Sequence, residues 1–150
     1  MKADPAPVPK ILVLASGSGT NLQALIDATR ERDFPGEIIA VGCNKPGAFA
    51  LERAAQANLT TFVVDHTKYG SREEFDATLL AEILRHNPDL VVLAGFMRIL
   101  TSDFVRAFRG RMLNIHPSLL PAYTGLNTHQ RVLEAGDRTH GVSIHFVTEE

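Results

Sequence analysis

Two polar residues near the end of a predicted strand, Asn114 and His116, have the types and spacing that acyl-transfer chemistry needs. Residues two apart on a strand share one face, so both side chains are expected to point the same way while Ile115 points into the core. An amide can donate to the oxyanion that develops when a carbonyl-like carbon is attacked, and an imidazole can move a proton near neutral pH. The alternative is a polar pair that is simply satisfied in the fold.

A glycine-rich turn near the N-terminus is typical of a site for a small anion. The predicted strand ending at Ala15 runs through residues 16–21 directly into a helix, and Thr20 and Asn21 can add side-chain donors. Glycines such as Gly19 let backbone N–H groups approach a phosphate, and a helix N-terminus adds unpaired donors. The spacing fits neither a dinucleotide fingerprint nor a P-loop, which favours a phosphomonoester. The alternative is a tight turn that uses glycine only for its geometry.

An apolar loop follows another predicted strand end, at residues 95–100. Apolar side chains at the carboxyl end of a strand are expected to line a slot for a flat heterocycle, whose edge the backbone could recognise. Packing beneath the edge of the sheet is the alternative. Arg98 lies inside this loop and is a candidate to meet a ligand.

The elements that must position these motifs alternate between strand and helix patterns. This alternation predicts an α/β fold, an open and mostly parallel sheet with helices on both faces. Ser71 and Glu74 form a capping-box pattern at the start of one helix, and Asn87 with Pro88 ends it. Residues 1–9 are expected to be a flexible leader, and residues 10–150 one domain without repeats. The predicted strands are 11–15, 38–43, 61–64, 90–94, 112–115 and 142–147, and a short helix is predicted at 128–135.

Composition excludes several classes of protein. The chain has 150 residues, 45% of them hydrophobic and 21% charged, which fits one globular domain. A net charge of −2 argues against nucleic acid as the main partner. The sequence lacks a continuous apolar segment for a membrane span, and its single cysteine, Cys43, fits a reducing cytoplasm. The histidines do not have a metal-site spacing, so we expect no metal.

Three motifs taken in order resemble glycinamide ribonucleotide formyltransferases. They are Ser16-Gly17-Ser18-Gly19-Thr20-Asn21-Leu22, then Gly95-Phe96-Met97-Arg98-Ile99-Leu100, then Asn114-Ile115-His116-Pro117-Ser118-Leu119-Leu120-Pro121. Residues 125–129 and 140–148 extend the resemblance, which runs from about Ile11 to the end of the chain. The family uses N10-formyltetrahydrofolate to formylate the glycyl amine of glycinamide ribonucleotide in purine synthesis.

The resemblance implies a role for each matching residue. Asn114 would donate to the oxyanion and His116 would transfer the proton. Gly19, Thr20 and Asn21 would bind the phosphate of the substrate. The reduced folate would contact Arg72, Met97, Arg98, Ile99, Leu100, Asn114, Thr148, Glu149 and Glu150. A cis bond is implied at Leu120–Pro121, and the expected partners are the ribonucleotide and the folate, with a homodimer as an option.

The sequence departs from the family pattern at its C-terminal side. After the Phe-Val-Thr stretch the family continues through a loop whose Asp tunes the histidine, whereas this sequence ends at Glu150. We expect a protein that truly ended there to transfer formyl groups poorly, because a catalytic histidine without its carboxylate loses orientation. It would also expose a sheet edge.

Three other functions stay open at this point. Formyltetrahydrofolate hydrolase and methionyl-tRNA formyltransferase share the Asn-x-His core. The hydrolase would not need a phosphate loop, and the tRNA enzyme would want a basic surface and a further domain. A non-catalytic module that binds phosphate or folate is the alternative from a different class.

Overall fold

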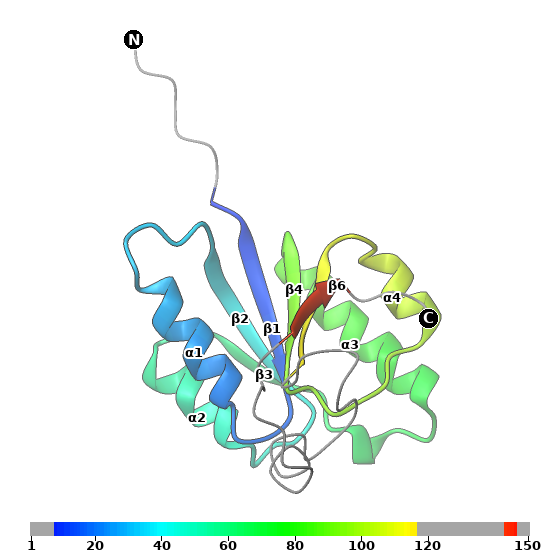
Figure 1. Cartoon of the computed structure of the whole chain (residues 1–150). Coiled ribbons are helices and arrows are strands. Elements are labelled where there is room, and N and C mark those ends of the chain that lie inside the picture. Colours follow the sequence, from blue (N-terminus) through cyan, green and yellow to red (C-terminus); the bar gives the residue numbers. More distant parts are fainter. Residues whose placement is uncertain (1–7, 117–142, 147–150) are drawn as a thin grey trace, which may run out of the picture.

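Six strands form one sheet in the order β3-β2-β1-β4-β5-β6 (Figure 1). The computed structural model describes residues 8–116 and 143–146, and the side chains of residues 8–115. The strands are β1 (Lys10–Ala15), β2 (Glu37–Cys43), β3 (Thr61–Val63), β4 (Leu90–Ala94), β5 (Met112–His116) and β6 (Ser143–Phe146). The helices are α1 (Thr20–Thr29), α2 (Phe49–Gln56), α3 (Arg72–His86) and α4 (Ser102–Ala107), with a 3-10 turn η1 (His66–Lys68).

The predicted α/β class and mostly parallel sheet are confirmed. Strands β1 to β5 are parallel to their neighbours, and only β6 runs antiparallel, against β5. Each predicted strand is found within one residue of its expected bounds among the described residues. The short helices α2 and α4 were not predicted. The helix predicted at 128–135, the bond at Leu120–Pro121 and residues 1–7 of the predicted leader lie outside the described residues.

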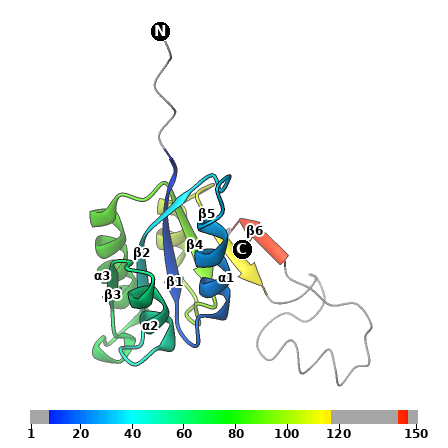
Figure 2. The same ribbon diagram turned by 90° about the vertical axis from the view of Figure 1, so that its left-hand side faces the viewer.

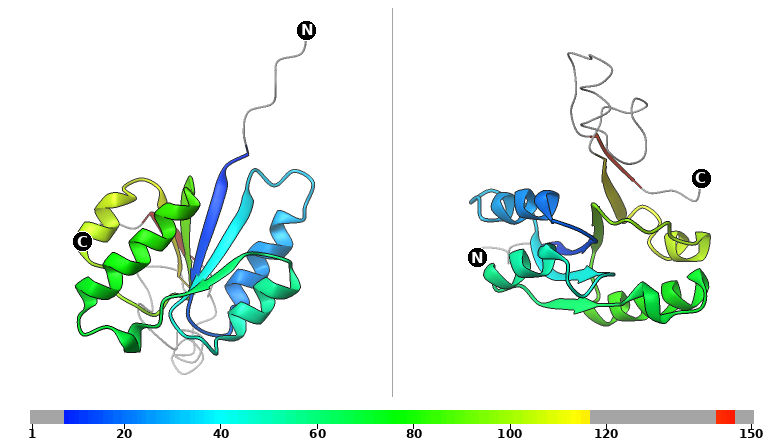
Figure 3. Two further views of the ribbon diagram at one scale, coloured as in Figure 1. Left: turned by 180° about the vertical axis from the view of Figure 1, so that it is seen from behind. Right: turned by 90° about the horizontal axis from the view of Figure 1, so that it is seen from below.

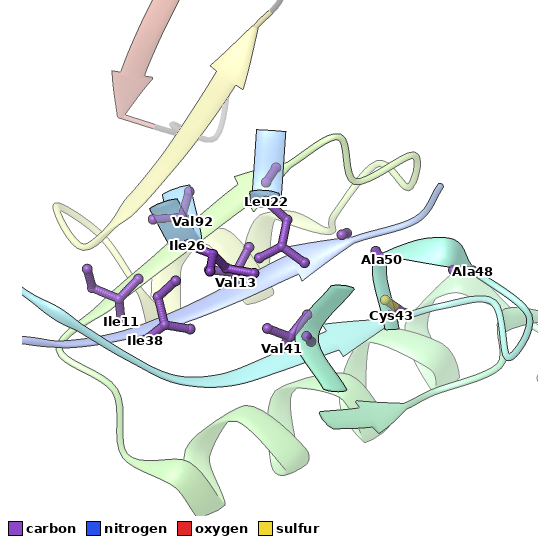
Figure 4. Packing of buried hydrophobic residues seen from close by; sticks show 13 residues of the cluster. Ile11, Val13, Leu22, Ile26, Ile38, Val41, Cys43, Ala48, Ala50 and Val92 are labelled. Atoms are coloured by element: carbon purple, nitrogen blue, oxygen red, sulfur yellow. The ribbon is translucent and has the colours of Figure 1, made fainter. Parts of the chain in front are cut away.

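Two hydrophobic cores hold the helices against the two faces of the sheet (Figure 3). On one face, α1 and α2 pack through Leu22, Ile26 and small alanines onto alternate residues of β1 and β2, as Figure 4 shows for Val13 and Val41. On the other face, α3 and α4 pack aromatic rings such as Phe75 and Phe104. Burial of these apolar surfaces is the main favourable contribution to folding.

The predicted capping of α3 is confirmed, with one difference in geometry. The Ser71 hydroxyl accepts the Glu74 N–H at 3.2 Å, as a capping box requires. The Glu74 carboxylate, however, accepts the N–H of Gly70 at 3.1 Å, one residue before the cap. Asn87 ends the helix in a left-handed conformation with φ 50°, ahead of Pro88. Both ends of α3 are therefore fixed by local hydrogen bonds.

Cys43 lies at the end of β2 and is only 2% exposed. Burial raises the pKa of its thiol from 9.0 to about 11. The thiolate is the reactive form, so we expect the folded protein to resist alkylation by iodoacetamide at pH values up to 9.0. Because the folded pKa is the higher one, the corresponding stability is fully present below pH 9.0 and falls as pH rises from 9.0 toward 11.

Denaturant unfolding of the protein and of Cys43→Ala, followed across this pH range, measures that contribution. The result is the difference between the two proteins, because every contribution that they share cancels. Parallel stability curves would contradict the buried-thiol account.

The order of the strands reverses beside β1. The chain moves outward from β1 to β2 and β3, then returns to the opposite side of β1 to form β4. In open α/β sheets, ligands bind at the carboxyl ends of the strands where this reversal occurs. Here that point lies between β1 and β4, and β5 is the next strand along, with β6 at the outer edge of the sheet (Figure 2).

Candidate functional site

The three motifs singled out in the sequence follow or end β1, β4 and β5, which are neighbours in the sheet. Leu14 is paired with Leu93, and Leu93 with Asn114. The glycine-rich loop follows β1, the apolar loop follows β4, and Asn114 lies near the end of β5. Because the three strands are parallel, their carboxyl ends lie along one edge of the sheet (Figure 1). The fold therefore gathers residues that are about 100 positions apart in the chain.

In the glycine-rich loop, three consecutive backbone carbonyls are occupied by groups on α1 and α2. The Gly17 carbonyl accepts the Ala50 N–H at 3.1 Å, and the Gly19 carbonyl accepts the Gln23 N–H at 2.8 Å. The Ser18 carbonyl accepts Nε of Arg53 at 2.6 Å. In a trans peptide the N–H points opposite to the carbonyl of the same unit. The next N–H groups along the chain, those of residues 18–20, are consequently turned away from these partners.

These N–H groups are suited to an anion. The N–H groups of residues 18–21 have no hydrogen-bond partner in the described part of the chain. Gly19 is the N-cap of α1, with φ 76° and no side-chain cap, so the helix leaves its first donors open. Unpaired N–H groups and the positive end of the helix dipole together favour a phosphate. Thr20 and Asn21 occupy the first turn of α1, which begins two residues earlier than the sequence pattern indicates.

Arg53 is a residue of this loop that sequence reasoning missed. Its Nε contacts Ser18, one terminal nitrogen lies 3.4 Å from the side-chain oxygen of Gln23, and its guanidinium lies 4.7 Å from the centre of the Phe49 ring. Among the described residues it forms no ion pair with a carboxylate. The chain separates Arg53 from Ser18 by 35 positions, and only the packing of α2 beside the loop reveals the contact.

The apolar loop after β4 divides its side chains between core and solvent. Phe96 and Leu100 pack against the core under α3 and α4, as the packing alternative predicts. Met97 and Ile99, in contrast, are 55% and 74% exposed. Exposed large apolar side chains beside the carboxyl ends of parallel strands are typical of a surface that covers an aromatic ligand. The packing interpretation therefore holds for Phe96 and Leu100, and a ligand slot at Met97 and Ile99 stays a prediction.

Arg98 lies with its guanidinium 5.4 Å from the centre of the Phe75 ring. Its buried Nε has no hydrogen-bond partner among the described residues. A buried donor without a partner destabilises a protein by about 1–3 kcal/mol, which favours a role in binding over a role in packing.

Asn114 and His116 both belong to β5, but the structure describes only the first side chain. Ile115 packs against the core under α1 and α2, so Asn114 lies on the opposite face, as strand alternation predicts. Asn114 is half-buried and stands opposite His145 of β6 in the register of the strands. His116 stands opposite Ser143. Its side chain, together with Thr148, Glu149 and Glu150, lies outside the described residues.

The remaining predicted residue, Arg72, is the first residue of α3 and is exposed. A pocket of about 320 Å³ lies between α3 and α4 and is lined partly by Asp76 and Thr101, so it borders the end of the apolar loop. In the described part of the chain no group of three or more His, Cys, Asp or Glu residues is arranged to hold a metal ion. No helix in that same part is long and apolar enough to cross a membrane.

The formyl transferase family matches residues 9–150, and the chain belongs to it. Within the family, it is 54% identical over 140 residues to phosphoribosylglycinamide formyltransferase of Escherichia coli, a match that covers 93% of this chain and 66% of that protein. The enzyme of the same name from Haemophilus influenzae is 49% identical over 94% of this chain and 66% of its own length. The chain thus spans about two thirds of these relatives.

Solved structures give the same family. The structure of phosphoribosylglycinamide formyltransferase from Coxiella burnetii superposes with a TM-score of 0.88 at 51% identity, covering 95% of this chain and 67% of that one. The structure from Brucella melitensis superposes with a TM-score of 0.90 at 41% identity, covering 95% and 74%. The described strand order and the motif loops therefore belong to a formyl transferase fold.

Proposed function

We propose that this chain carries the N-terminal and central part of a phosphoribosylglycinamide formyltransferase. The reaction transfers a formyl group from N10-formyltetrahydrofolate to the glycyl amine of glycinamide ribonucleotide in purine biosynthesis. The observation that carries the proposal is the meeting of an anion loop, an exposed apolar loop and Asn114 at the carboxyl ends of three neighbouring strands. The identity of 54% to the Escherichia coli enzyme supports the choice of substrates.

Each part of the site has a task in this reaction. The open N–H groups of residues 18–21 bind the phosphate, and Met97, Arg98, Ile99 and Leu100 line the folate ring. The glycyl amine attacks the formyl carbon, and the carbon–nitrogen bond to the folate breaks. The Asn114 amide donates to the formyl oxygen as that oxygen gains charge, and His116 carries the proton from the amine to the departing nitrogen. Arg72, Thr148, Glu149 and Glu150 contact the rest of the folate.

A formyl-transfer assay with glycinamide ribonucleotide present or omitted tests the proposal. Two proteins are compared: this chain and an extended form that continues into the C-terminal part of the Escherichia coli relative. We expect the extended form to consume the folate only when the ribonucleotide is present. Consumption at the same rate without it would favour a hydrolase, and binding without turnover by both proteins would favour a non-catalytic module. We also propose that the protein is cytoplasmic. We propose a homodimer as an option for its assembly, and sedimentation of the protein in solution would test it.

Replacing Arg53 tests the anion loop on its own. Arg53→Met keeps the aliphatic stem against Phe49 but removes the donor to the Ser18 carbonyl and the positive charge. We expect the affinity for inorganic phosphate, measured by calorimetry, to fall about three- to tenfold, because the peptide that presents the Gly19 N–H loses its anchor.

Arg85→Met is the matched control, because Arg85 lies on α3 and its ion pair with Glu82 is exposed. An equal loss in both variants would mean that net charge alone, and not the geometry of the loop, sets the affinity.

A further inference from the structure

The apolar loop is held at both ends by buried polar side chains from other parts of the chain. At its start, the Met97 N–H donates to the Ser16 hydroxyl at 2.7 Å. At its end, the Thr101 N–H donates to the Asp76 carboxylate at 2.6 Å. Ser16 is fully buried and Asp76 is 4% exposed. These contacts link the loop to residues 81 and 25 positions away in the sequence.

Between these two contacts only side chains hold the loop: Leu100 packs against the core, and the Arg98 guanidinium lies 5.4 Å from the centre of the Phe75 ring. The N–H groups of residues 98–100 have no hydrogen-bond partner in the described part of the chain. Met97 and Ile99 are exposed, so their side chains contribute little packing. Ordering a free backbone costs about 1–2 kcal/mol per residue. A loop with this composition therefore needs external contacts if it is to present one conformation to a ligand.

Burial of the Asp76 carboxylate also has a cost in folding free energy. One carboxylate oxygen accepts the Thr101 N–H, while the other is buried without a hydrogen-bond partner among the described residues. An unpartnered buried oxygen opposes folding. Its position on the inner face of α3, among apolar neighbours such as Phe75 and Leu79, would otherwise suit a hydrophobic residue.

We infer that Ser16 and Asp76 are positioning residues that preorganise the loop 95–101 for the flat ring of its ligand. The inference rests on the proposed function for the identity of that ligand, a reduced folate. Ser16 has a second connection, since it is the first residue of the glycine-rich turn proposed to bind phosphate. The Ser16 hydroxyl therefore connects the turn proposed to bind phosphate with the loop proposed to bind the folate.

The test uses Asp76→Ala, Asp76→Asn and Ser16→Ala in the full 150-residue chain. Asp76→Asn keeps an acceptor oxygen for the Thr101 N–H, so it is the matched control for the loss of the hydrogen bond. The probe is 5-formyltetrahydrofolate, an air-stable reduced folate, and inorganic phosphate is the second ligand. We expect Asp76→Ala and Ser16→Ala to weaken the folate Kd about tenfold, the value for a hydrogen bond to a buried polar partner. Asp76→Asn should stay within about threefold of the original, and phosphate binding should change less than about twofold in the two Asp76 variants. Equal losses in Asp76→Ala and Asp76→Asn would overturn the inference.

Amide hydrogen exchange separates this inference from the proposed function. We expect the Met97 and Thr101 amides to be protected in the unmodified protein, and the amides of residues 98–100 to exchange quickly. Thr101 should lose its protection in Asp76→Ala and Met97 in Ser16→Ala, with the strand amides of β1 unchanged. If no variant binds folate, the proposed function fails, yet the exchange pattern still decides whether the two side chains hold the loop. Unchanged exchange at Met97 and Thr101 would overturn it.

Discussion

Asn114→Ala is expected to lower kcat for formyl transfer about 100- to 1000-fold in the extended form, with KM values for both substrates changed little. A single donor to a developing oxyanion contributes about 3–4 kcal/mol to transition-state stabilisation, and this contribution is absent in the ground state. The structure places Asn114 near the carboxyl end of β5, on the face opposite Ile115, which packs against the core.

Asn114→Asp removes the amide donor but keeps the volume of the side chain, so it distinguishes the effect of the donor from that of the volume. The aspartate has the same shape but carries a negative charge where the oxyanion forms, so its loss should be at least as large as that of the alanine variant. A kcat within about threefold of the original for either variant would remove Asn114 from the proposed chemistry.

Gly19→Ala is expected to abolish measurable phosphate binding and to lower the free energy of unfolding by about 2–5 kcal/mol. Gly19 has φ 76°, a conformation that L-residues adopt at a cost. An added Cβ would lie 2.8 Å from both the Cα and the Cβ of Ala50 on α2, and that backbone cannot give way without moving the helix. The loop would lose the shape that directs its N–H groups outward.

Gly17→Ala is the control in the same loop, because a Cβ at Gly17 would meet nothing within 4 Å. Thermal unfolding and phosphate titration of the two variants give the comparison. Similar losses in both would show that the loop tolerates no side chain anywhere, and the argument from Gly19 and Ala50 would fail.

The elements predicted correctly from the sequence are those whose signal is local. The strand at Leu90–Ala94 is an unbroken apolar run that follows Asp89 and ends at Gly95, and α3 carries periodic large side chains with a cap at Ser71. Helix α2 was not predicted because it has only 8 residues and its buried residues, Ala50 and Ala54, are alanines rather than large apolar side chains. Helix α4 has only 6 residues, too few for a period to be seen.

The candidate site divides in the same way. Gly19, Met97 and Asn114 could be named from motifs, since each motif is contiguous and follows or ends a strand. Arg53 and Asp76 could not, because their roles depend on contacts 35 and 25 positions away that exist only after the sheet is assembled. The antiparallel direction of β6 could not be predicted from the sequence either, because an alternating pattern is the same for a parallel and an antiparallel strand.

The central place of β1 has a consequence for how the chain reaches its native state. Strand β1, which precedes the other described strands in the chain, completes its pairing only with β4, and its contacts near β4 begin 79 positions later with the hydrogen bond between Lys10 and Asp89. Until then Leu12 and Leu14 lie along an open edge of a nascent β-layer, where another polypeptide could add a strand. Chains whose synthesis stops before residue 90 should accordingly self-associate. Binding of chaperones to the growing chain should be greatest before β4 has been made.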